Sequence, residues 1–177
     1  MDKAPQLIFR EPHLEDGLAI SNLVKNCPPL DVNSLYVSLL LCRDFHDTCV
    51  LVEHDSQIVG FLSAYFPPHR ENTIFIWQAA VDSSMRGCGV ASRMLDALLS
   101  RENLSEVNYL ETTITPSNKS SQKLFRSLAK RLNTECRTCS GFSSDLFGEA
   151  EEHEPEELYQ LGPFTLELSY GEKTQVL

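Results

Sequence analysis

The first part of the chain has apolar positions at strand spacing and then at helical spacing. Leu7 to Arg10 predicts a short strand. Leu14 to Lys25 predicts a helix whose buried face holds Leu14, Leu18, Leu23 and Val24. Pro28-Pro29 ends this region because proline donates no backbone hydrogen bond and favours extended geometry before it. A second helix is expected from about Asn33 to Leu41, capped by Asp31 or Asn33.

Extended patterns dominate the middle of the chain. Thr48 to Glu53 and Gln57 to Phe66 predict a hairpin closed by the polar turn His54 to Ser56, and Thr73 to Val81 predicts a third strand. A helix is expected from about Gly89 to Leu99. Its buried face holds Val90, Ala91, Met94, Leu95, Leu98 and Leu99.

Helix and strand patterns alternate in the last third. Tyr109 to Ile114 predicts a strand, and Asn118 leads into a helix with Leu124, Phe125, Leu128 and Leu132 inward. Two further strands are expected at Arg137 to Phe142 and Pro163 to Tyr170, separated by an acidic loop, Glu149 to Glu157. This order predicts the α/β class: a mixed, mostly antiparallel sheet with helices on its faces. With no internal repeat or flexible linker, residues 1–177 are expected to form one domain.

Composition and charge exclude several classes of partner. The chain is 42% hydrophobic and 23% charged, as in globular proteins, and no stretch approaches the roughly 20 apolar residues that span a bilayer. A net charge of −10 argues against binding nucleic acid or an anionic membrane. The polar N-terminus lacks a secretory signal, so we expect a cytoplasmic protein with reduced cysteines. Cys136 and Cys139 have no second pair at zinc-site spacing, and no metal is expected.

A glycine-containing loop lies between the third strand of the middle region and the helix after it. Free amides at a helix N-terminus, glycines that permit close approach and an arginine suit a cofactor pyrophosphate. A plain tight turn is the alternative. Ser92 and Val90 stand where a dinucleotide fingerprint needs its third glycine, and no Gly-Lys-Ser/Thr exists for a Walker loop. The loop consists of Arg86, Gly87, Cys88, Gly89, Val90 and Ala91.

Two segments carry a family resemblance. Val81 to Ala91 resembles the coenzyme A motif of the GNAT N-acetyltransferases, Arg/Gln-x-x-Gly-x-Gly/Ala. Thr115 to Phe125 resembles the later GNAT motif, in which an asparagine opens a helix beside the pantetheine arm. The resemblance implies the GNAT fold, with central strands that splay apart, and acetyl-CoA as cosubstrate. The implied coenzyme contacts outside the loop are Ala79, Val81, Asn118 and Ser120.

Three other segments narrow the resemblance. Pro28 to Tyr36, Ala64 to Pro68 and Trp77 to Asp82 resemble the diaminobutyrate acetyltransferases of ectoine biosynthesis. The implied reaction is direct attack of the 4-amino group of L-2,4-diaminobutyrate on acetyl-CoA in a ternary complex. The product is N4-acetyl-L-2,4-diaminobutyrate, the precursor of ectoine. Such enzymes are expected to be homodimers.

The implied substrate is a zwitterion with an additional ammonium. Its site therefore needs carboxylates that bind the amines, donors that bind the substrate carboxylate, and a wall that fixes which amine reaches the thioester. Asp31 is an anchor or a helix cap, Tyr36 lines the pocket or packs, and Trp77 is expected to form the wall. His153 and Glu156 lie in a segment that resembles a late, His- and Glu-rich segment of the same family, which makes them amine ligands or proton acceptors. The candidate catalytic residues are therefore Asp31, Trp77, His153 and Glu156.

The sequence leaves open the general acid, the residue that binds the substrate carboxylate and the alternative functions. Phe125 stands where many GNAT enzymes place a tyrosine acid, so no tyrosine serves at that position. Arg70 and Arg43 are both candidates for the substrate carboxylate. The alternatives are a GNAT enzyme for another small amine, such as a polyamine or an aminoglycoside, and a non-catalytic acyl-CoA sensor.

Overall fold

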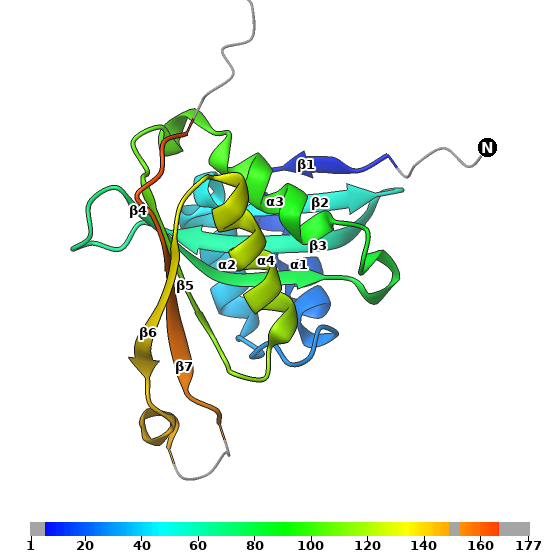
Figure 1. The fold of residues 1–177 in the computed structure, drawn as a ribbon. Coiled ribbons are helices and arrows are strands. Elements are labelled where there is room, and N and C mark those ends of the chain that lie inside the picture. The colour runs from blue at the N-terminus through cyan, green and yellow to red at the C-terminus, as the bar shows by residue number, and fades with distance from the viewer. Residues whose placement is uncertain (1–5, 149–152, 167–177) are drawn as a thin grey trace, which may run out of the picture.

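The computed structural model describes residues 6–148 and 153–166, and their strands form one sheet (Figure 1). The strand order is β1-β2-β3-β4-β5-β7-β6, in which only β4 and β5 are parallel neighbours. The predicted mixed, mostly antiparallel sheet is therefore confirmed. The strands are β1 (Ile8–Arg10), β2 (Val50–His54), β3 (Gln57–Tyr65), β4 (Thr73–Val81), β5 (Tyr109–Ile114), β6 (Cys136–Phe142) and β7 (Glu156–Leu161). The α-helices are α1 (Gly17–Lys25), α2 (Leu35–Asp44), α3 (Val90–Leu99) and α4 (Lys119–Arg131).

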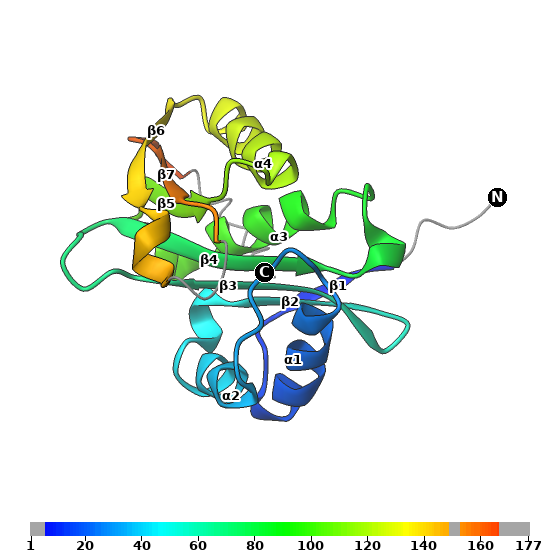
Figure 2. The same cartoon turned by 90° about the horizontal axis from the view of Figure 1, so that it is seen from below.

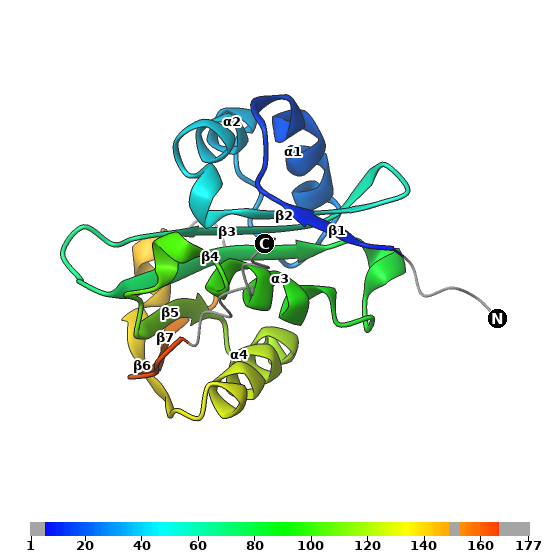
Figure 3. The ribbon, with the colours of Figure 1, turned by 90° about the horizontal axis from the view of Figure 1, so that it is seen from above.

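Helices cover both faces of the sheet. Figures 2 and 3 show α1 and α2 on one face and α3 and α4 on the other. Phe61 belongs to the buried cluster beneath α1 and α2, while its neighbour Leu62 belongs to the cluster beneath α3 and α4. Successive side chains of a strand point to opposite faces, so β3 contributes to both clusters. The sheet is thus the middle layer of three.

Most predicted elements are confirmed within two residues of their expected ends. β4 and β5 have the predicted bounds, and β2 and β3 form the predicted hairpin. Asn118 opens α4 as predicted: its side-chain oxygen accepts from the amide of Ser121 at 3.1 Å. These elements were predictable because their signals are local.

The buried face of the first helix differs from the prediction. Leu14 and Leu18 are 50% and 59% exposed, and the buried positions of α1 are Gly17, Ile20, Ser21, Leu23 and Val24. Leu14 lies in a 3₁₀ turn (Leu14–Asp16) that precedes α1. A 3₁₀ turn has three residues per turn instead of 3.6, so the helical spacing of α1 does not extend back to Leu14. Leu23 and Val24 are buried as predicted, while Leu18 lies outside the buried face of α1.

The predicted cap of the second helix is also wrong. α2 begins at Leu35 with Ser34 as its N-cap residue, and it continues to Asp44. Asp31 and Asn33 belong to the connection that precedes the helix, where Asn33 Nδ2 lies 3.5 Å from Gln78 Oε1. Their side chains are therefore free for contacts other than capping.

The last strand lies earlier in the chain than predicted. β7 spans Glu156–Leu161, so it begins at the end of the expected acidic loop and ends before the predicted strand, and residues 163–166 form no strand. The rest of the predicted strand, 167–170, and residues 149–152 of the predicted loop lie outside the described residues. Tyr159 and Leu161 are buried while the first two positions are glutamates, which concealed the apolar alternation.

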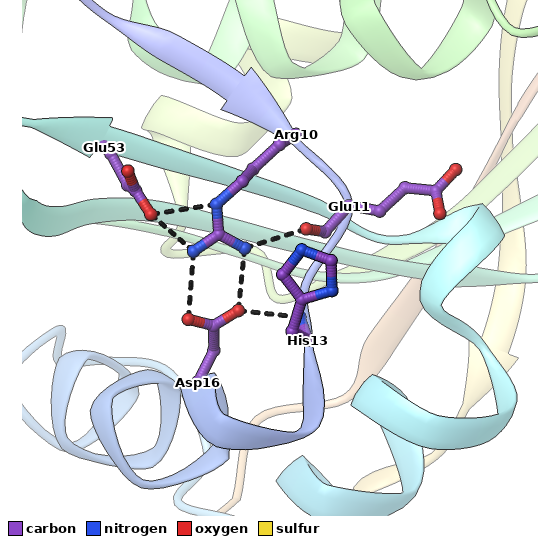
Figure 4. Close-up of polar contacts among 5 residues, drawn as sticks. All are labelled: Arg10, Glu11, His13, Asp16 and Glu53. Atoms are coloured by element: carbon purple, nitrogen blue, oxygen red, sulfur yellow. Dashed lines mark hydrogen bonds and ion pairs between the residues drawn. The ribbon is translucent and has the colours of Figure 1, made fainter.

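A partly buried ion-pair cluster joins the N-terminal strand to the helical layer (Figure 4). Arg10 donates to both carboxylate oxygens of Asp16, at 2.7 and 3.0 Å, and its Nε donates to Glu53 at 2.8 Å. The hydrogen bond from Arg10 lowers the pKa of Asp16 from the ordinary 3.8, although partial burial opposes the shift. Arg10 thus ties β1, β2 and the turn before α1 together.

We expect Asp16→Asn to lower the free energy of unfolding by about 1–3 kcal/mol at neutral pH, because it removes charge-assisted hydrogen bonds. A carboxylate with a lowered folded pKa stabilises above its ordinary pKa of 3.8 and loses that effect as the pH falls through the lowered value. The difference between the proteins should therefore shrink from about pH 5 to about pH 2 in urea unfolding. Asp44→Asn, in an exposed pair with Arg43, is the control and should change nothing measurable.

Candidate active site

The parallel strands β4 and β5 separate after only three residue pairs. They are paired from Thr73–Tyr109 to Phe75–Glu111, and from Ile76 to Val81 no described strand pairs with that edge of β4. Figure 1 shows β5, β7 and β6 diverging from β1–β4. The predicted splay of the strand that holds Ala79 and Val81 is confirmed. It leaves a row of backbone amides and carbonyls free to bind a ligand.

A β-bulge lies at the point of separation. Ser63 pairs with Gln78 and Ala64 pairs with Ile76, which leaves Trp77 as the additional residue on β4. A bulge bends its strand and redirects a side chain. Trp77 is 43% exposed between two buried neighbours and lines the adjoining cavity, which is the place expected of a pocket wall.

The gap between the strands opens into a cavity of about 690 Å³. Several predicted site residues line it together, although they are distant in sequence: Asp31, Trp77, Ala79, Asn118, His153 and Glu156. Other predicted residues do not line it: Tyr36, which is 66% exposed on α2, Val81, Ser120 and the loop Arg86 to Ala91. Loop and cavity are joined by β4, whose open edge runs from one to the other.

His153 is held in one orientation. Its Nδ1 lies 2.6 Å from the backbone oxygen of Glu154, and its ring stacks on Phe147 with centroids 3.8 Å apart. A carbonyl oxygen accepts, so Nδ1 carries a proton and the lone pair of the neutral ring is on Nε2. Nε2 lies 3.8 Å from Oδ2 of Asp31. The basic nitrogen therefore faces a carboxylate in the cavity.

Two pKa values are shifted at this cluster. The hydrogen bond to the Glu154 carbonyl raises the pKa of His153; partial burial opposes it, and the negative charges of Asp31 and Glu156 add to it. Burial raises the pKa of Glu156, while a hydrogen bond from Thr113 and the charge of His153 partly offset it. Because both pKa values are raised, the protonated form of each of these two side chains is favoured.

The segment that carries Asp31 is fixed by a residue that the sequence reasoning missed. Gln78 is buried on β4, and its Nε2 donates to the backbone oxygen of Asp31 at 2.8 Å. The bulge at Trp77 interrupts the alternation of side chains along β4, so the periodic pattern of the sequence did not indicate the role of Gln78. Gln78 positions Asp31 over the β4 edge.

A second missed contact links the segment before β7 to the start of α4. The carboxylate of Glu154 accepts from the amide of Ser117 at 3.0 Å and also from its hydroxyl. Ser117 immediately precedes Asn118, the cap residue of α4. The residues next to His153 are thereby attached to the segment expected to flank the coenzyme. No motif signalled the pair, because its members are far apart in sequence.

The glycine loop has the backbone that a helix N-terminal anion site requires. Gly87 and Gly89 have φ of 78° and 75°, and Gly89 is the N-cap residue of α3. A Cβ at either position would meet nothing within 4 Å, so the need for glycine is conformational. Residues 86–89 are exposed, and the first amides of α3 have no acceptor within the helix. This arrangement can accept a phosphate.

The remaining chemistry of the site is simple. Phe125 lines the cavity and is 3% exposed, so α4 presents a side chain without a transferable proton at this position. Within residues 6–148 and 153–166, no three His, Cys, Asp or Glu side chains are grouped to hold a metal ion. No helix in those ranges is long and apolar enough to cross a membrane. All six cysteines are free thiols.

The fold and the loop define a class of protein, and comparison with known proteins identifies it. The acetyltransferase (GNAT) family model matches residues 18–129, so the chain belongs to the GNAT family. Its fold also matches the ribosomal-protein-S18-alanine N-acetyltransferase of Escherichia coli, with a TM-score of 0.67 at 12% identity, over 97% of this chain and all of the other. At that identity the likeness shows the fold alone.

Within this class the chain belongs to the L-2,4-diaminobutyric acid acetyltransferases. It is 46% identical to that protein of Marinococcus halophilus over 159 residues, covering 90% of this chain and 91% of the relative. The corresponding protein of Halomonas elongata is 45% identical over 163 residues, 92% of this chain and 84% of the relative. A solved structure, diaminobutyrate acetyltransferase EctA from Paenibacillus lautus with its substrate L-2,4-diaminobutyric acid and coenzyme A, matches with a TM-score of 0.89 at 36% identity, over 93% and 99% of the two chains. Both sequence resemblances are confirmed.

We expect Asp31→Asn to lower the pKa of His153, because the carboxylate of Asp31 is one of the charges that raise it. The measurement is an NMR titration of the His153 ring in both proteins. Glu11→Gln is the control, since Glu11 lies against His46 and should not affect His153. An unchanged His153 pKa in Asp31→Asn would show that the two side chains do not face each other in solution.

Proposed function

We propose that this chain transfers the acetyl group of acetyl-CoA to the 4-amino group of L-2,4-diaminobutyrate. The product, N4-acetyl-L-2,4-diaminobutyrate, supplies ectoine synthesis and so osmotic adaptation. One observation carries the proposal. In a chain 46% identical to a curated acetyltransferase of diaminobutyric acid, the cavity at the split between β4 and β5 is lined by Asp31, Trp77, His153 and Glu156 together.

The coenzyme in this proposal lies along the open edge of β4. The backbone of Ala79 and Val81 bonds the pantetheine arm, and Asn118 and Ser120 flank it from the first turn of α4. The pyrophosphate lies on the exposed amides before and within the first turn of α3, with Arg86 as a charged donor. The residues of that cradle are Arg86, Gly87, Cys88, Gly89, Val90 and Ala91. The missing strand pairing and the two positive φ values support this placement.

The amino acid occupies the cavity beside that edge. The carboxylates of Asp31 and Glu156 suit its ammonium groups, and the indole of Trp77 closes one side. Tyr36, which sequence reasoning also assigned to the substrate, lies outside the cavity on the exposed face of α2. The acceptor site therefore depends on the connection before α2, the bulge of β4 and the start of β7.

The proposed chemistry is direct transfer. The 4-ammonium loses its proton to Nε2 of His153, and the neutral nitrogen attacks the thioester carbonyl carbon. A free amide of β4 donates to the oxyanion that develops, and the carbon–sulfur bond then breaks. The attacking nitrogen loses its second proton to water as the amide forms, and the coenzyme leaves as the thiolate, because Phe125 has no proton to give. Holding both substrates at the same strand edge supplies much of the rate.

We also propose that residues 1–177 form one acetyltransferase domain that acts in the cytoplasm as a homodimer. Exposed apolar side chains beside the cavity support the dimer: Phe142, Leu146 and Phe147 follow one another at the end of β6 and the turn after it. Apolar side chains gathered in this way commonly lie in an interface. The net charge of −10 supports partners other than nucleic acid or anionic membrane.

The proposed activity predicts release of coenzyme A thiol from acetyl-CoA only when L-2,4-diaminobutyrate is present. NMR of the product should show the acetyl group on N4. Ornithine and spermidine are the comparison amines, and equal or greater turnover with either would refute the assignment. Tight binding of acetyl-CoA without an acetylated product from any amine would instead support the sensor.

The loop geometry predicts that Gly89→Ala weakens coenzyme A binding about tenfold, because an alanine Cβ opposes the positive φ and displaces an amide that binds phosphate. Calorimetric titration measures the dissociation constant. Gly148→Ala is the matched control: Gly148 also has positive φ, 87°, with nothing within 4 Å of an added Cβ, but it lies outside the loop. Equal losses of affinity in both variants would contradict the assigned role of the loop.

A further inference from the structure

Arg70 lines the cavity from the connection between β3 and β4. Its Nε lies 3.2 Å from Oε2 of Glu111, and its side chain is 48% exposed. The other arginine left open by the sequence, Arg43, is on α2, where it pairs with Asp44 and does not line the cavity. Of the two arginines that the sequence left as candidates, the structure therefore places only Arg70 at the cavity.

Glu111, a residue of β5, forms an ion pair with Arg70. It is 2% exposed on β5, and it lies opposite Phe75 in the last pair before β4 and β5 separate. Its Oε1 accepts from Gln160 Nε2 at 2.9 Å, and its Oε2 faces Arg70. Oε2 makes no hydrogen bond with any described residue, and its ion pair with Arg70 runs through Nε, which leaves the two terminal nitrogens of the guanidinium for another anion.

We propose that Arg70 binds the carboxylate of the amino-acid substrate and thereby determines which of its two amines is acetylated. The inference rests on the proposed function and adds a specificity residue to it. A guanidinium held at one edge is well shaped to bind a carboxylate through its terminal nitrogens. Glu111 acts through Arg70 and is a positioning residue.

The two ends of the cavity fit the two ends of the substrate. Arg70 is at the end where β4 and β5 are still paired, opposite Glu111. Glu156 begins β7, whose next residue pairs with Ile114 at the other end of β5. Three residues of strand separate these positions, about 10 Å. The carboxylate carbon and N4 of diaminobutyrate are about 5 Å apart when extended, from bonds of about 1.5 Å, and side chains span the remainder.

This orientation accounts for regiochemistry. The 2-amino group is attached to the carbon next to the carboxylate, so it stays at the Arg70 end. The 4-amino group is two carbons further along and reaches the open edge of β4, where the thioester lies in the proposed complex. Without Arg70 the substrate can reverse, and either amine can reach the thioester.

The experiment compares two substrates in variants of the full chain. Arg70→Met should lower kcat/KM for L-2,4-diaminobutyrate about 10- to 100-fold, the range for losing charge-assisted hydrogen bonds. It should leave kcat/KM for 1,3-diaminopropane, which lacks the carboxylate, within about threefold. NMR of the product from diaminobutyrate should now show N2-acetylated product beside N4.

Two further variants guard against effects on folding. Arg70→Met combined with Glu111→Gln removes both charges, so no unpaired carboxylate stays buried, and it should give the same substrate selectivity as Arg70→Met. Arg43→Met tests the other arginine and should retain the kinetics for both amines. Glu111→Gln alone should raise KM for diaminobutyrate, and should have no further effect once Arg70 is replaced.

Three results would overturn the inference about Arg70, and they differ from a failure of the proposed function. Equal losses for both amines in Arg70→Met, or unchanged kinetics with diaminobutyrate and N4 product only, would overturn the inference. A larger loss in Arg43→Met would overturn it as well. Failure of the proposed function is a different result: the unaltered protein would then not acetylate diaminobutyrate in preference to other amines, whatever residue occupies position 70.

Discussion

The early end of pairing between β4 and β5 is the constraint on which both halves of the active site depend. After Phe75 and Glu111 the two strands separate, and the backbone of β4 keeps hydrogen-bonding groups that a continuous sheet would have used. The bulge at Trp77 lies just beyond this point. A bulge increases local twist, which directs β4 away from β5 and turns the indole into the space between them. One irregularity thus supplies both a docking edge and a wall.

The acceptor half is assembled from segments that share no local sequence signal. Asp31 comes from the connection before α2, and Gln78 fixes it through a backbone hydrogen bond. His153 comes from the segment that leads into β7, Glu156 is the first residue of β7, and Glu154 attaches this segment to Ser117. Carboxylates in a partly desolvated cavity bind ammonium groups more strongly than they would in water. Cationic partners lie on the same walls, with His153 facing Asp31 and Arg70 facing the buried Glu111.

Sequence reasoning succeeded where structure is determined locally. The β2–β3 hairpin, the bounds of β4 and β5, and Asn118 as a helix cap follow from turn residues, alternation and capping chemistry. It failed for Leu14, which lies in a 3₁₀ turn before α1, for Leu18 and for the position of β7, whereas Leu23 and Val24 are buried as predicted. Of the predicted acceptor residues, the structure gathers four around the cavity and leaves Tyr36 outside. The sequence did not indicate the roles of Gln78, Ser117 and Glu154, because each role is a contact between residues that are far apart in the sequence.

The position of β7 determines the order in which the site can form. β7 is the last strand of the described chain, yet it lies between β5 and β6 and pairs with both. During synthesis from the N-terminus, the coenzyme loop and the helix after it can fold while β5 still lacks its second neighbour. The proton acceptor His153 and the carboxylate of Glu156 arrive only with β7 and the residues just before it. A nascent chain can thus acquire the donor half of the site early, while the capacity to acetylate an amine comes with the final insertion into the sheet.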